Sequence, residues 1–548
     1  MDCGKARHVR NMRRALGGMA LVLAAAGCDS FWSHLAEDCE LLVTCEHFYP
    51  SGTGGGPPNP ACEADPTEDA GAVIDECAVF ASASAGPEGD GTKARPYASL
   101  GEAVANANGK RVLACTSGAF AENVTIEAGV EVIGGFNCGA EWTWSAEGRS
   151  AIEGPAGAAA LTLGEGASGV KVRSFAVRAA SGKEASAEAQ ATEAGRSSIG
   201  VVVADIEAAL LQVDVTAGDG ADGAKGETPM EASMAGAAGM TGTNACSLPA
   251  AVRGGEPGVT TCEDGETRGG GGGRGGITEM DGGSGQRGED GAPLPEPNPN
   301  NRGIGGIGQM DAAGECEAGA NGKSGDPGDA GAAGSSTMLT LAGIAGGDGA
   351  NGTTGTPGQG GGGGGGARAG QFCPASPDPV EGPGASGGGG GAGGCGGKGG
   401  GGGKAGGSSL GIVSLGTKLV LTDVTIVVGT AGKGGDGAGG RGGALGGNGA
   451  TGGAASGLAG SIPGCRGGDG GRGGDGGPGG GGRGGHAIGI AYAAGPSAAV
   501  ELKAFTPGTF GDGGAAAPGG PEESAGAPGQ GASCWDLAAQ SECGGQGQ

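Results

Sequence analysis

The stretch GGDGGRGGDGGPGGGGRGG, residues 467–485, places a glycine at every third position without exception. Glycine triplets recur at residues 319–334, 349–358 and 434–452. A period of three suits packed, threefold extended helices, because a residue without a side chain lets neighbouring chains approach. Two arrangements remain open for these segments: an ordered bundle of polyglycine helices, or flexible glycine loops.

Three other glycine-rich motifs do not match. Collagen needs long uninterrupted repeats with roughly 15–20% proline, whereas the opening stretch holds 7 such glycines and the whole chain has 28 prolines. A phosphate loop has the pattern GxxxxGK[ST]. Gly322-Lys323-Ser324 matches its end, but the glycine required five residues before Gly322 is Glu317. The calcium-binding repeat GGxGxDxUx fails in the opening stretch at Arg472 and Gly474.

The first residues have the pattern of an export signal. Five basic residues precede an apolar run at 15–27, which is too short to span a bilayer, and Cys28 follows. The string LAAAGC, ending at Cys28, resembles a bacterial lipobox, with Ala25 where leucine is usual. We therefore expect a lipoprotein signal at 1–27, lipidation of Cys28 and a tether at 28–61. A plain signal peptide cut nearby is the alternative.

The composition predicts an acidic, exported, disulfide-bonded protein. The net charge is −27, and loss of the first 27 residues, which carry a surplus of four positive charges, leaves −31, which disfavours nucleic-acid partners. Fourteen cysteines remain besides Cys3 and Cys28, and disulfides are expected in an oxidising compartment. The candidate pairs, with connectivity left open, are Cys39–Cys45, Cys62–Cys77, Cys115–Cys138, Cys246–Cys262 and Cys534–Cys543. The four histidines are scattered, so neither a metal site nor a cofactor is predicted.

Residues 62–216 contain short β-rich runs, and between the first two of them Leu100, Ala103, Val104 and Ala107 have helical spacing. The order of GDGTKARPYASLGEAVANA (89–107), RVLACTSGAFAENVTI (111–126) and GVEVIGGFNC (129–138) resembles the entry into pectin-lyase-like right-handed parallel β-helices. Cys138, followed by Trp142 and Trp144, is similar to a group of bacterial surface lipoproteins built this way. The resemblance implies an all-β, right-handed parallel β-helix with an N-terminal capping helix and Gly-rich (PGRS-like) inserts.

The remainder reads as further coils separated by inserts. Runs beginning at Ser198, Ser409 and Ala487 share Gly200, Gly411 and Gly489 in one place and end in Gly-Asp-Gly. Insertions at one edge of a solenoid form a single face of loops, which is often a binding face. After the tether, the expected segments are first coils at 62–216, an insert at 217–335, a short strand at 336–345, an insert at 346–407, a coil at 408–429, a triplet insert at 430–485, a coil at 486–506 and a Gly-rich tail with a Cys pair at 507–548.

The expected coils also carry acids and bases that a polysaccharide lyase or glycosidase could use. They are Glu122, Glu127, Glu131, Arg173, Arg178, Asp205, Asp214 and Asp423. Asp214 and Asp423 hold the same place in QVDVT and LTDVT, which favours a structural role, such as ending a strand or capping a turn.

No stretch matches a lyase or glycosidase motif, so no catalytic residue is assigned. We expect a non-enzymatic, lipid-anchored protein of a bacterial outer membrane or cell surface, acting in adhesion, matrix contact or envelope structure. Its expected partners are the membrane, through the lipid on Cys28, and polysaccharide or other surface proteins. A carbohydrate-active enzyme and a carbohydrate- or ice-binding module are the alternatives.

Overall fold

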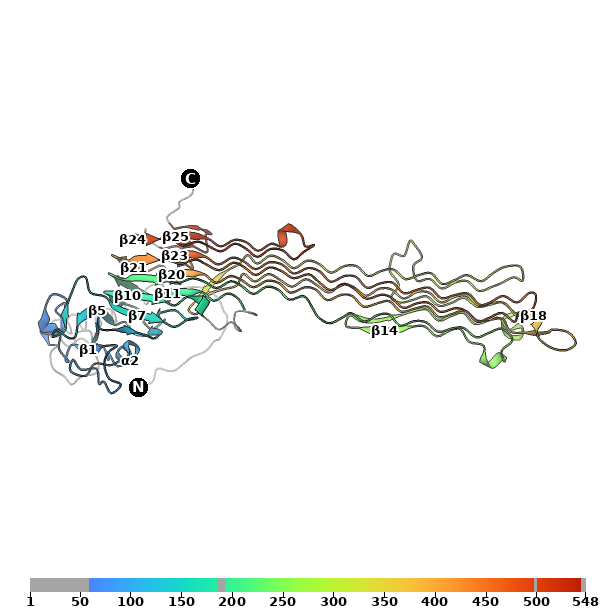
Figure 1. The fold of residues 1–548 in the computed structure, drawn as a ribbon, viewed down its shortest axis with the longest axis horizontal. Coiled ribbons are helices and arrows are strands. Elements are labelled where there is room, and N and C mark those ends of the chain that lie inside the picture. The colour runs from blue at the N-terminus through green and yellow to red at the C-terminus, as the bar shows by residue number, and fades with distance from the viewer. Residues whose placement is uncertain (1–58, 185–192, 497–499, 544–548) are drawn as a thin grey trace, which may run out of the picture.

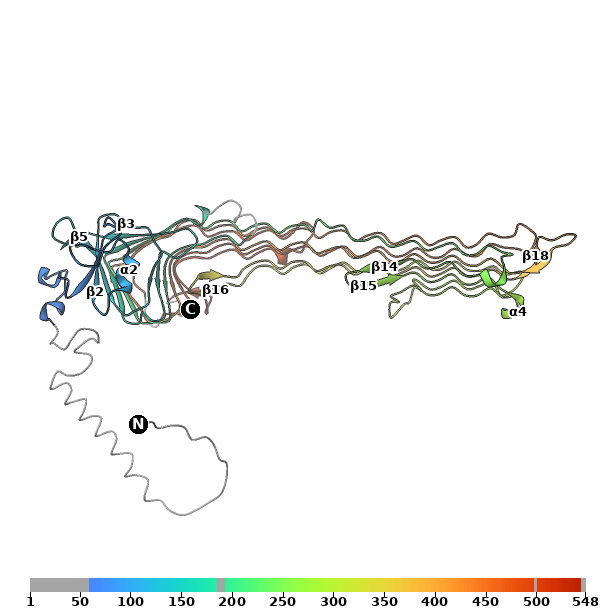
Figure 2. The same cartoon turned by 90° about the horizontal axis from the view of Figure 1, so that it is seen from below.

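The computed structural model describes residues 59–184, 193–496 and 500–543. Sheets gather at one end of the molecule, and long extended segments run side by side away from them (Figures 1 and 2). We call the segments 218–335, 346–408, 429–486 and 507–530 the arm, and the rest of the described chain the sheet region. The signal at 1–27, Cys28 and almost all of the tether lie outside the described residues.

Three large sheets make up the sheet region. Sheet 1 consists, in order, of β1 (Ala78–Ala81), β2 (Arg111–Cys115), β5 (Glu131–Asn137), β9 (Val170–Arg173), β12 (Ala208–Leu211) and β21 (Leu419–Thr422), with β6 (Thr143–Trp144) beside β5. Sheet 2 consists of β24 (Ala504–Thr506), β22 (Thr425–Val427), β13 (Asp214–Ala217), β10 (Phe175–Ala179), β7 (Ser150–Gly154) and β3 (Ala119–Phe120). Sheet 3 consists of β26 (Ser541–Glu542), β25 (Gly531–Asp536), β23 (Ala487–Tyr492), β20 (Ser409–Ser414), β11 (Ser198–Val203), β8 (Leu161–Leu163) and β4 (Val124–Ile126).

Short helices and three hairpins complete the described elements. The helices are α2 (Leu100–Ala105), α4 (Thr278–Asp281), η1 (Pro60–Cys62), η2 (Ala70–Ala72), η3 (Gly182–Glu184), η4 (Pro249–Ala251) and η5 (Glu522–Ser524). The antiparallel hairpins are β14 (Val259–Cys262) with β15 (Gly265–Arg268), β16 (Met338–Thr340) with β17 (Gly343–Ala345), and β18 (Gly370–Cys373) with β19 (Val380–Gly382). Helix α2 begins at the N-cap Ser99, whose hydroxyl accepts from the Glu102 amide, and it packs against β1, β2 and β4.

The prediction of an all-β, right-handed parallel β-helix is wrong. The described strands form several separate, mostly parallel sheets, and sheets 1 and 3 are mixed because β6 and β26 pair antiparallel to their neighbours. A few short helices lie among them, so the arrangement is closer to the open sheets of α/β proteins. No closed solenoid is present in the described part of the chain.

The three runs that share a glycine lie next to one another in sheet 3. Ile199 of β11 is in register with Leu410 of β20, which is in register with Ile488 of β23. All three strands are buried along their whole length, because Leu339 of β16 and its partly buried neighbours cover their outer face. Burial on both faces explains why these strands read as continuous apolar runs.

The proposed equivalence of Asp214 and Asp423 is off by two residues. Asp214 is in register with Thr425, and Leu211 is in register with Thr422. Asp423 therefore lies level with Gln212, and these two residues share a left-handed backbone, with φ of 53° and 54°. The shared feature is a turn that leads from sheet 1 into sheet 2, while Asp214 itself belongs to β13.

In the arm, extended segments exchange backbone hydrogen bonds with a period of three. Within the opening stretch, the amides of Gly470 and Gly473 donate to Gly447 and Ala444 at 2.8 and 2.9 Å. The next residue of each triplet donates to another segment, as in the 2.8 Å bond from Gly471 to Gln359. Of the two arrangements left open for the glycine triplets, these segments have the packed and ordered one.

Steric contact explains the glycines of the opening stretch. A β-carbon added at Gly470 would lie 1.9 Å from the carbonyl oxygen of Ala392, and one at Gly474 would lie 1.9 Å from that of Asp326. Real β-carbons do not approach an oxygen so closely, so each position excludes a side chain. The third residue of the triplet faces solvent, as Arg472 and Asp475 do, and there a side chain is tolerated.

A segment therefore contains more glycine when more of its sides are covered by neighbouring segments. Residues 319–334 have one glycine per triplet, with exposed residues between most of them. The seven glycines at 360–366 are all buried, and β-carbons at Gly360, Gly361 and Gly362 would meet three different segments within 2.2 Å. Hydrogen bonds join this run to six neighbours, contacted at Gly270, Glu289, Gly306, Ala320, Gly391 and Gly468.

Acidic side chains complete the hydrogen bonding at the outer positions of the arm. Asp469 accepts from the amide of Gly449 at 2.8 Å, and Asp475 accepts from that of Gly443 at 2.9 Å. A basic residue often precedes the acid by one triplet, so both lie on the same side of the segment. These pairs are Arg287–Asp290, Lys323–Asp326, Lys433–Asp436, Arg466–Asp469 and Arg472–Asp475.

The steric explanation predicts different effects for the same substitution at two arm glycines. Gly474→Ala should destabilise the arm by about 2 kcal/mol or more, because its methyl group would collide with the Asp326 carbonyl. Gly439→Ala is the matched control, since no atom lies within 4 Å of the added carbon, and should stabilise by about 0.5 kcal/mol. Amide hydrogen exchange in residues 319–334 measures the difference, and equal protection in the two variants would contradict the explanation.

Candidate functional site

The acids and bases predicted in the coils mostly serve the structure. Glu122 accepts from the Ser99 hydroxyl and the Leu100 amide, both at 2.7 Å, and so holds the start of α2. Asp214 pairs with Arg149 at 3.3 Å, and Arg178 pairs with Glu153 at 3.3 Å. Of the eight candidates, Glu131 and Arg173 lie on adjacent strands of sheet 1, two registered positions apart. No catalytic grouping of all eight is formed.

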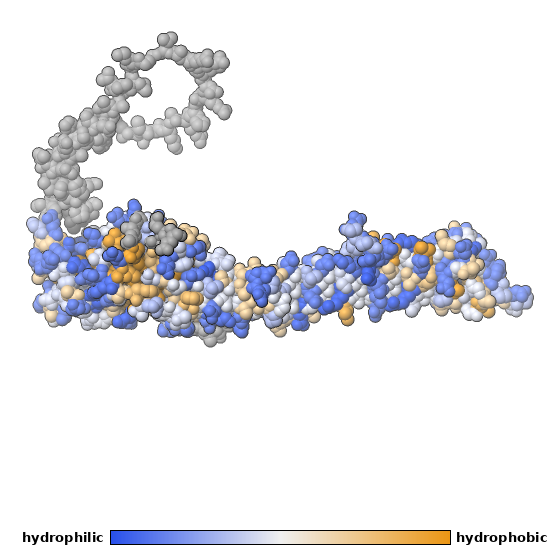
Figure 3. Space-filling model, turned by 90° about the horizontal axis from the view of Figure 1, so that it is seen from above, coloured by the Kyte–Doolittle hydropathy of each residue, from blue (hydrophilic) through white to orange (hydrophobic). Residues whose placement is uncertain are grey.

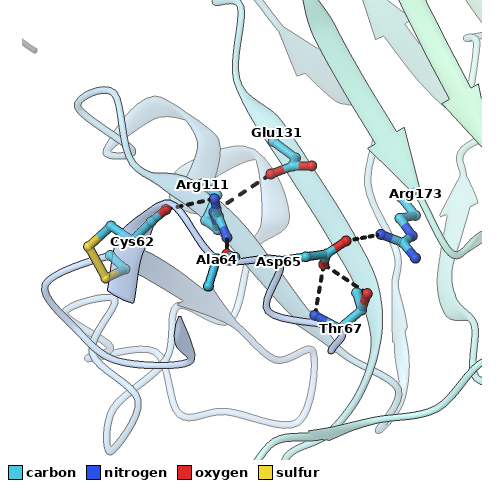
Figure 4. Close-up of polar contacts among 8 residues, drawn as sticks. Cys62, Ala64, Asp65, Thr67, Arg111, Glu131 and Arg173 are labelled. Atoms are coloured by element: carbon cyan, nitrogen blue, oxygen red, sulfur yellow. Dashed lines mark hydrogen bonds and ion pairs between the residues drawn. A yellow bond between two sulfur atoms is a disulfide. The ribbon is translucent and has the colours of Figure 1, made fainter. Parts of the chain in front are cut away.

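Figure 4 shows what Glu131 and Arg173 do. Arg111 lies between the Glu131 carboxylate, 3.6 Å away, and the carbonyls of Cys62 and Ala64, to which it donates at 2.9 and 2.7 Å. Arg173 donates to Asp65 at 2.9 Å. These side chains hold the segment 60–67, which we call the N-terminal strap, against the outer face of sheet 1.

Asp65 stays ionised within the strap. Partial burial raises its pKa, but hydrogen bonds from the amide and hydroxyl of Thr67 and the ion pair with Arg173 outweigh burial, so the net pKa is lowered. Arg173 also lies over the ring of Trp144, with 5.3 Å to the ring centroid. The charged side chains of this cluster are already paired with one another, and their role is to hold the strap in place.

The distal end of the arm is a second place where distant residues meet. Five turns, residues 246–251, 277–284, 310–315, 368–383 and 456–463, form what we call the arm tip (Figure 1). Thr278 donates to Glu381 at 2.5 Å, and Arg368 donates to the carbonyl of Met310 at 3.1 Å. Arg274, just before α4, donates from one terminal nitrogen to both carboxylate oxygens of Asp281 at 2.7 Å and fixes that helix.

Large apolar side chains are exposed at the arm tip. The exposed fractions are 78% for Leu248, 65% for Met280, 60% for Met310, 49% for Val380 and 39% for Leu458. Along the arm the surface is mostly hydrophilic, with separate apolar side chains over its distal half and a hydrophilic extreme end in this view (Figure 3). Contiguous exposed apolar patches mark interaction sites, and we take the five exposed residues on these turns as the candidate for one.

Disulfides brace both the strap and the arm. The pairs Cys62–Cys77, Cys115–Cys138 and Cys534–Cys543 form, as the sequence suggested. The suggested Cys246–Cys262 pair is wrong: Cys246 bonds to Cys373 and Cys262 to Cys395, because neighbouring arm segments are far apart in sequence. Cys316 bonds to Cys465. Cys39 and Cys45 lie outside the described residues, as does Cys28.

A hollow of about 390 Å³ lies on the side of the arm, lined in part by the Cys262–Cys395 disulfide. Its one lysine, Lys398, is held by Glu231 at 2.5 Å and Glu263 at 3.0 Å. The hydrogen bond that Lys398 donates to Glu231, followed by the one it donates to Glu263, raises the pKa of Lys398. A lysine clamped in its charged form is a poor general base or nucleophile.

Comparisons with known proteins returned no match to a family model, to a curated protein or to a solved structure. Across the described ranges, no set of three or more metal-ligating His, Cys, Asp or Glu side chains is gathered. Nor does any described helix have the length and hydropathy needed to cross a bilayer. The arm tip is therefore the candidate functional site that the geometry supports best.

Sequence reasoning placed binding on Gly-rich inserts but missed the tip. The signal available was the isolated large apolar residues within turn-forming strings, such as Leu248 before Pro249 and Val380 in PASPDPVEG. These residues meet at the tip only because each insert turns back at a similar distance from the sheets (Figure 1). The triplet period does not predict where an insert turns.

The strap should open in acid. An aspartate whose pKa is lowered in the folded state stabilises above its unfolded pKa, and this stabilisation is lost as the pH falls through the folded value. Amide exchange in residues 60–67 should therefore rise below about pH 4, while Asp65→Asn should exchange faster than the wild type above that pH and converge with it in acid. Glu153→Gln, which removes an exposed ion pair elsewhere, should leave the strap unchanged; a wild-type strap that is unaffected by acid would contradict this role.

Proposed function

We propose that this chain is an exported, lipid-anchored surface protein without enzymatic activity, whose arm presents an apolar tip for adhesion, matrix contact or envelope interaction. The observation that carries the proposal is the arm tip itself. Its exposed Leu248, Val380 and Leu458 stand at the far end of a hydrogen-bonded rod, well away from the sheet region (Figure 1). A surface placed this way meets a partner before the rest of the molecule does.

Export is supported by the cysteines. Six disulfides join twelve of the described cysteines, as expected in an oxidising compartment. Lipidation of Cys28 would fix the chain at the end from which the strap leads into sheet 1, and the arm extends away from that sheet (Figure 2). The membrane is then the partner of the N-terminus, and polysaccharide or another surface protein is the partner of the tip.

The alternatives have less support. A carbohydrate-active enzyme would need unpaired acids facing a common groove, whereas the candidate acid Glu131 is paired with Arg111 and the candidate base Arg173 is paired with Asp65. An ice-binding face would need a flat array of small apolar groups. Many outer triplet positions carry charged pairs instead, such as Arg472 with Asp475.

The tip should govern attachment. Full-length protein carrying Leu248→Ser, Val380→Ser and Leu458→Ser should lose at least tenfold in retention on polystyrene beads, because the apolar area at the tip is removed. A control with Met230→Ser and Leu445→Ser, exposed at 91% and 70% on the side of the arm, should retain binding. Equal retention of both variants would contradict a tip-directed function.

The anchor is tested separately. Cys28→Ser should move the protein from the membrane fraction to the soluble fraction, since the lipid chains supply the membrane affinity. Detergent phase partitioning of the intact and variant proteins measures the change. Partitioning of the variant into the detergent phase, as for the intact protein, would contradict lipidation at this residue.

A further inference from the structure

A buried arginine lies where the arm enters the sheet region. Arg483 is 6% exposed and stands four residues before β23. One of its terminal nitrogens donates to the carbonyl of Ser335, but its Nε is buried and has no hydrogen-bond partner. Although the chain is strongly acidic, no carboxylate within the described ranges forms an ion pair with Arg483.

His486 follows one triplet later and is 2% exposed. Its Nδ1 accepts from the amide of Gln530 at 3.1 Å, so the proton of the neutral ring is on Nε2. Burial, followed by the charge of Arg483, lowers the pKa of His486 to about 3, so the ring is neutral at physiological pH. Its buried Nε2 is a second donor without a partner.

A third unpaired group belongs to the segment that covers Arg483. Thr337 lies two residues after Ser335, at the start of the β16–β17 hairpin, and its buried hydroxyl has no partner. The next segment of the chain contacts the same arginine, since the Arg483 amide donates to the carbonyl of Gly347 at 2.7 Å. Arg483 therefore contacts the chain both before the hairpin, at Ser335, and after it, at Gly347.

The three unpaired groups share one chemistry. The Nε–H of Arg483 and the Nε2–H of His486 are donors, the Thr337 hydroxyl can donate, and Arg483 brings a positive charge. A water molecule could accept from two of them and donate to an acceptor such as the Ser335 carbonyl, but it would leave the charge of Arg483 unbalanced. A small anion can accept from any of these donors and balances the buried charge, which otherwise carries a large desolvation cost.

We propose that the base of the arm binds one small inorganic anion of the halide class, held by Arg483, His486 and Thr337. Bound there, the anion fastens the β16–β17 hairpin to the segment that leads into β23. It is thus a structural ligand at the junction between arm and sheets, and it does not depend on the function proposed for the tip.

The test compares salts at one ionic strength. The thermal midpoint of the full chain should rise by roughly 2–4 °C, and saturate, as sodium bromide or chloride replaces sodium gluconate. Arg483→Met should abolish the rise. Arg472→Met is the matched control, because Arg472 lies on the same segment but is exposed, and should keep the full rise.

A second measurement needs no variant to fold. Broadening of the chloride NMR line by the wild-type protein should be reversed by bromide and not by gluconate. Equal midpoints of the wild-type protein in gluconate and halide, or absence of reversible broadening, would overturn the proposal and leave water as the partner of these groups. Equal loss of the rise in the Arg472→Met control would overturn it as well.

Discussion

The arm depends on how closely the backbone of each glycine approaches the carbonyl oxygen of a neighbouring segment. A β-carbon at most arm glycines would lie about 2 Å from that oxygen, as at Gly470 and Gly474. Because the arm has no room for side chains between its segments, it cannot be held by an ordinary hydrophobic core. Backbone hydrogen bonds, each close to 2.8 Å and repeated every triplet, take over that role.

This constraint also accounts for the polar composition. At the outer positions some amides point away from neighbouring segments, and Asp469 and Asp475 accept from amides of the adjacent segment. Arg466 and Arg472, one triplet earlier, then balance those carboxylates. Part of the acidity that the composition displays therefore serves backbone groups, and the large apolar side chains that are buried lie mainly in the sheet region.

Some of this architecture could be predicted from the sequence. The triplet period indicated close packing as one of two options, and the shared glycines correctly grouped β11, β20 and β23. The β-helix prediction failed because local resemblance and apolar runs do not state how strands assemble into sheets or where antiparallel strands such as β6 join. The Cys246–Cys262 pairing failed because nearness in sequence is a poor guide when segments run out and return. The eight charged candidates were real surface groups, but the pattern did not show which partners they meet, such as Asp65 for Arg173.

The long separations within the arm have a consequence for the order of folding. Asp219 accepts from the amide of Thr430, a residue 211 positions later, and the Cys316–Cys465 bond closes a separation of 149. An outgoing segment therefore lacks its neighbours until the chain far downstream has been made. Contacts of such range are slow to form, so the arm must assemble as a late, collective step. The sheet strands that precede residue 217 can pair first and serve as the template from which the glycine segments are zipped together.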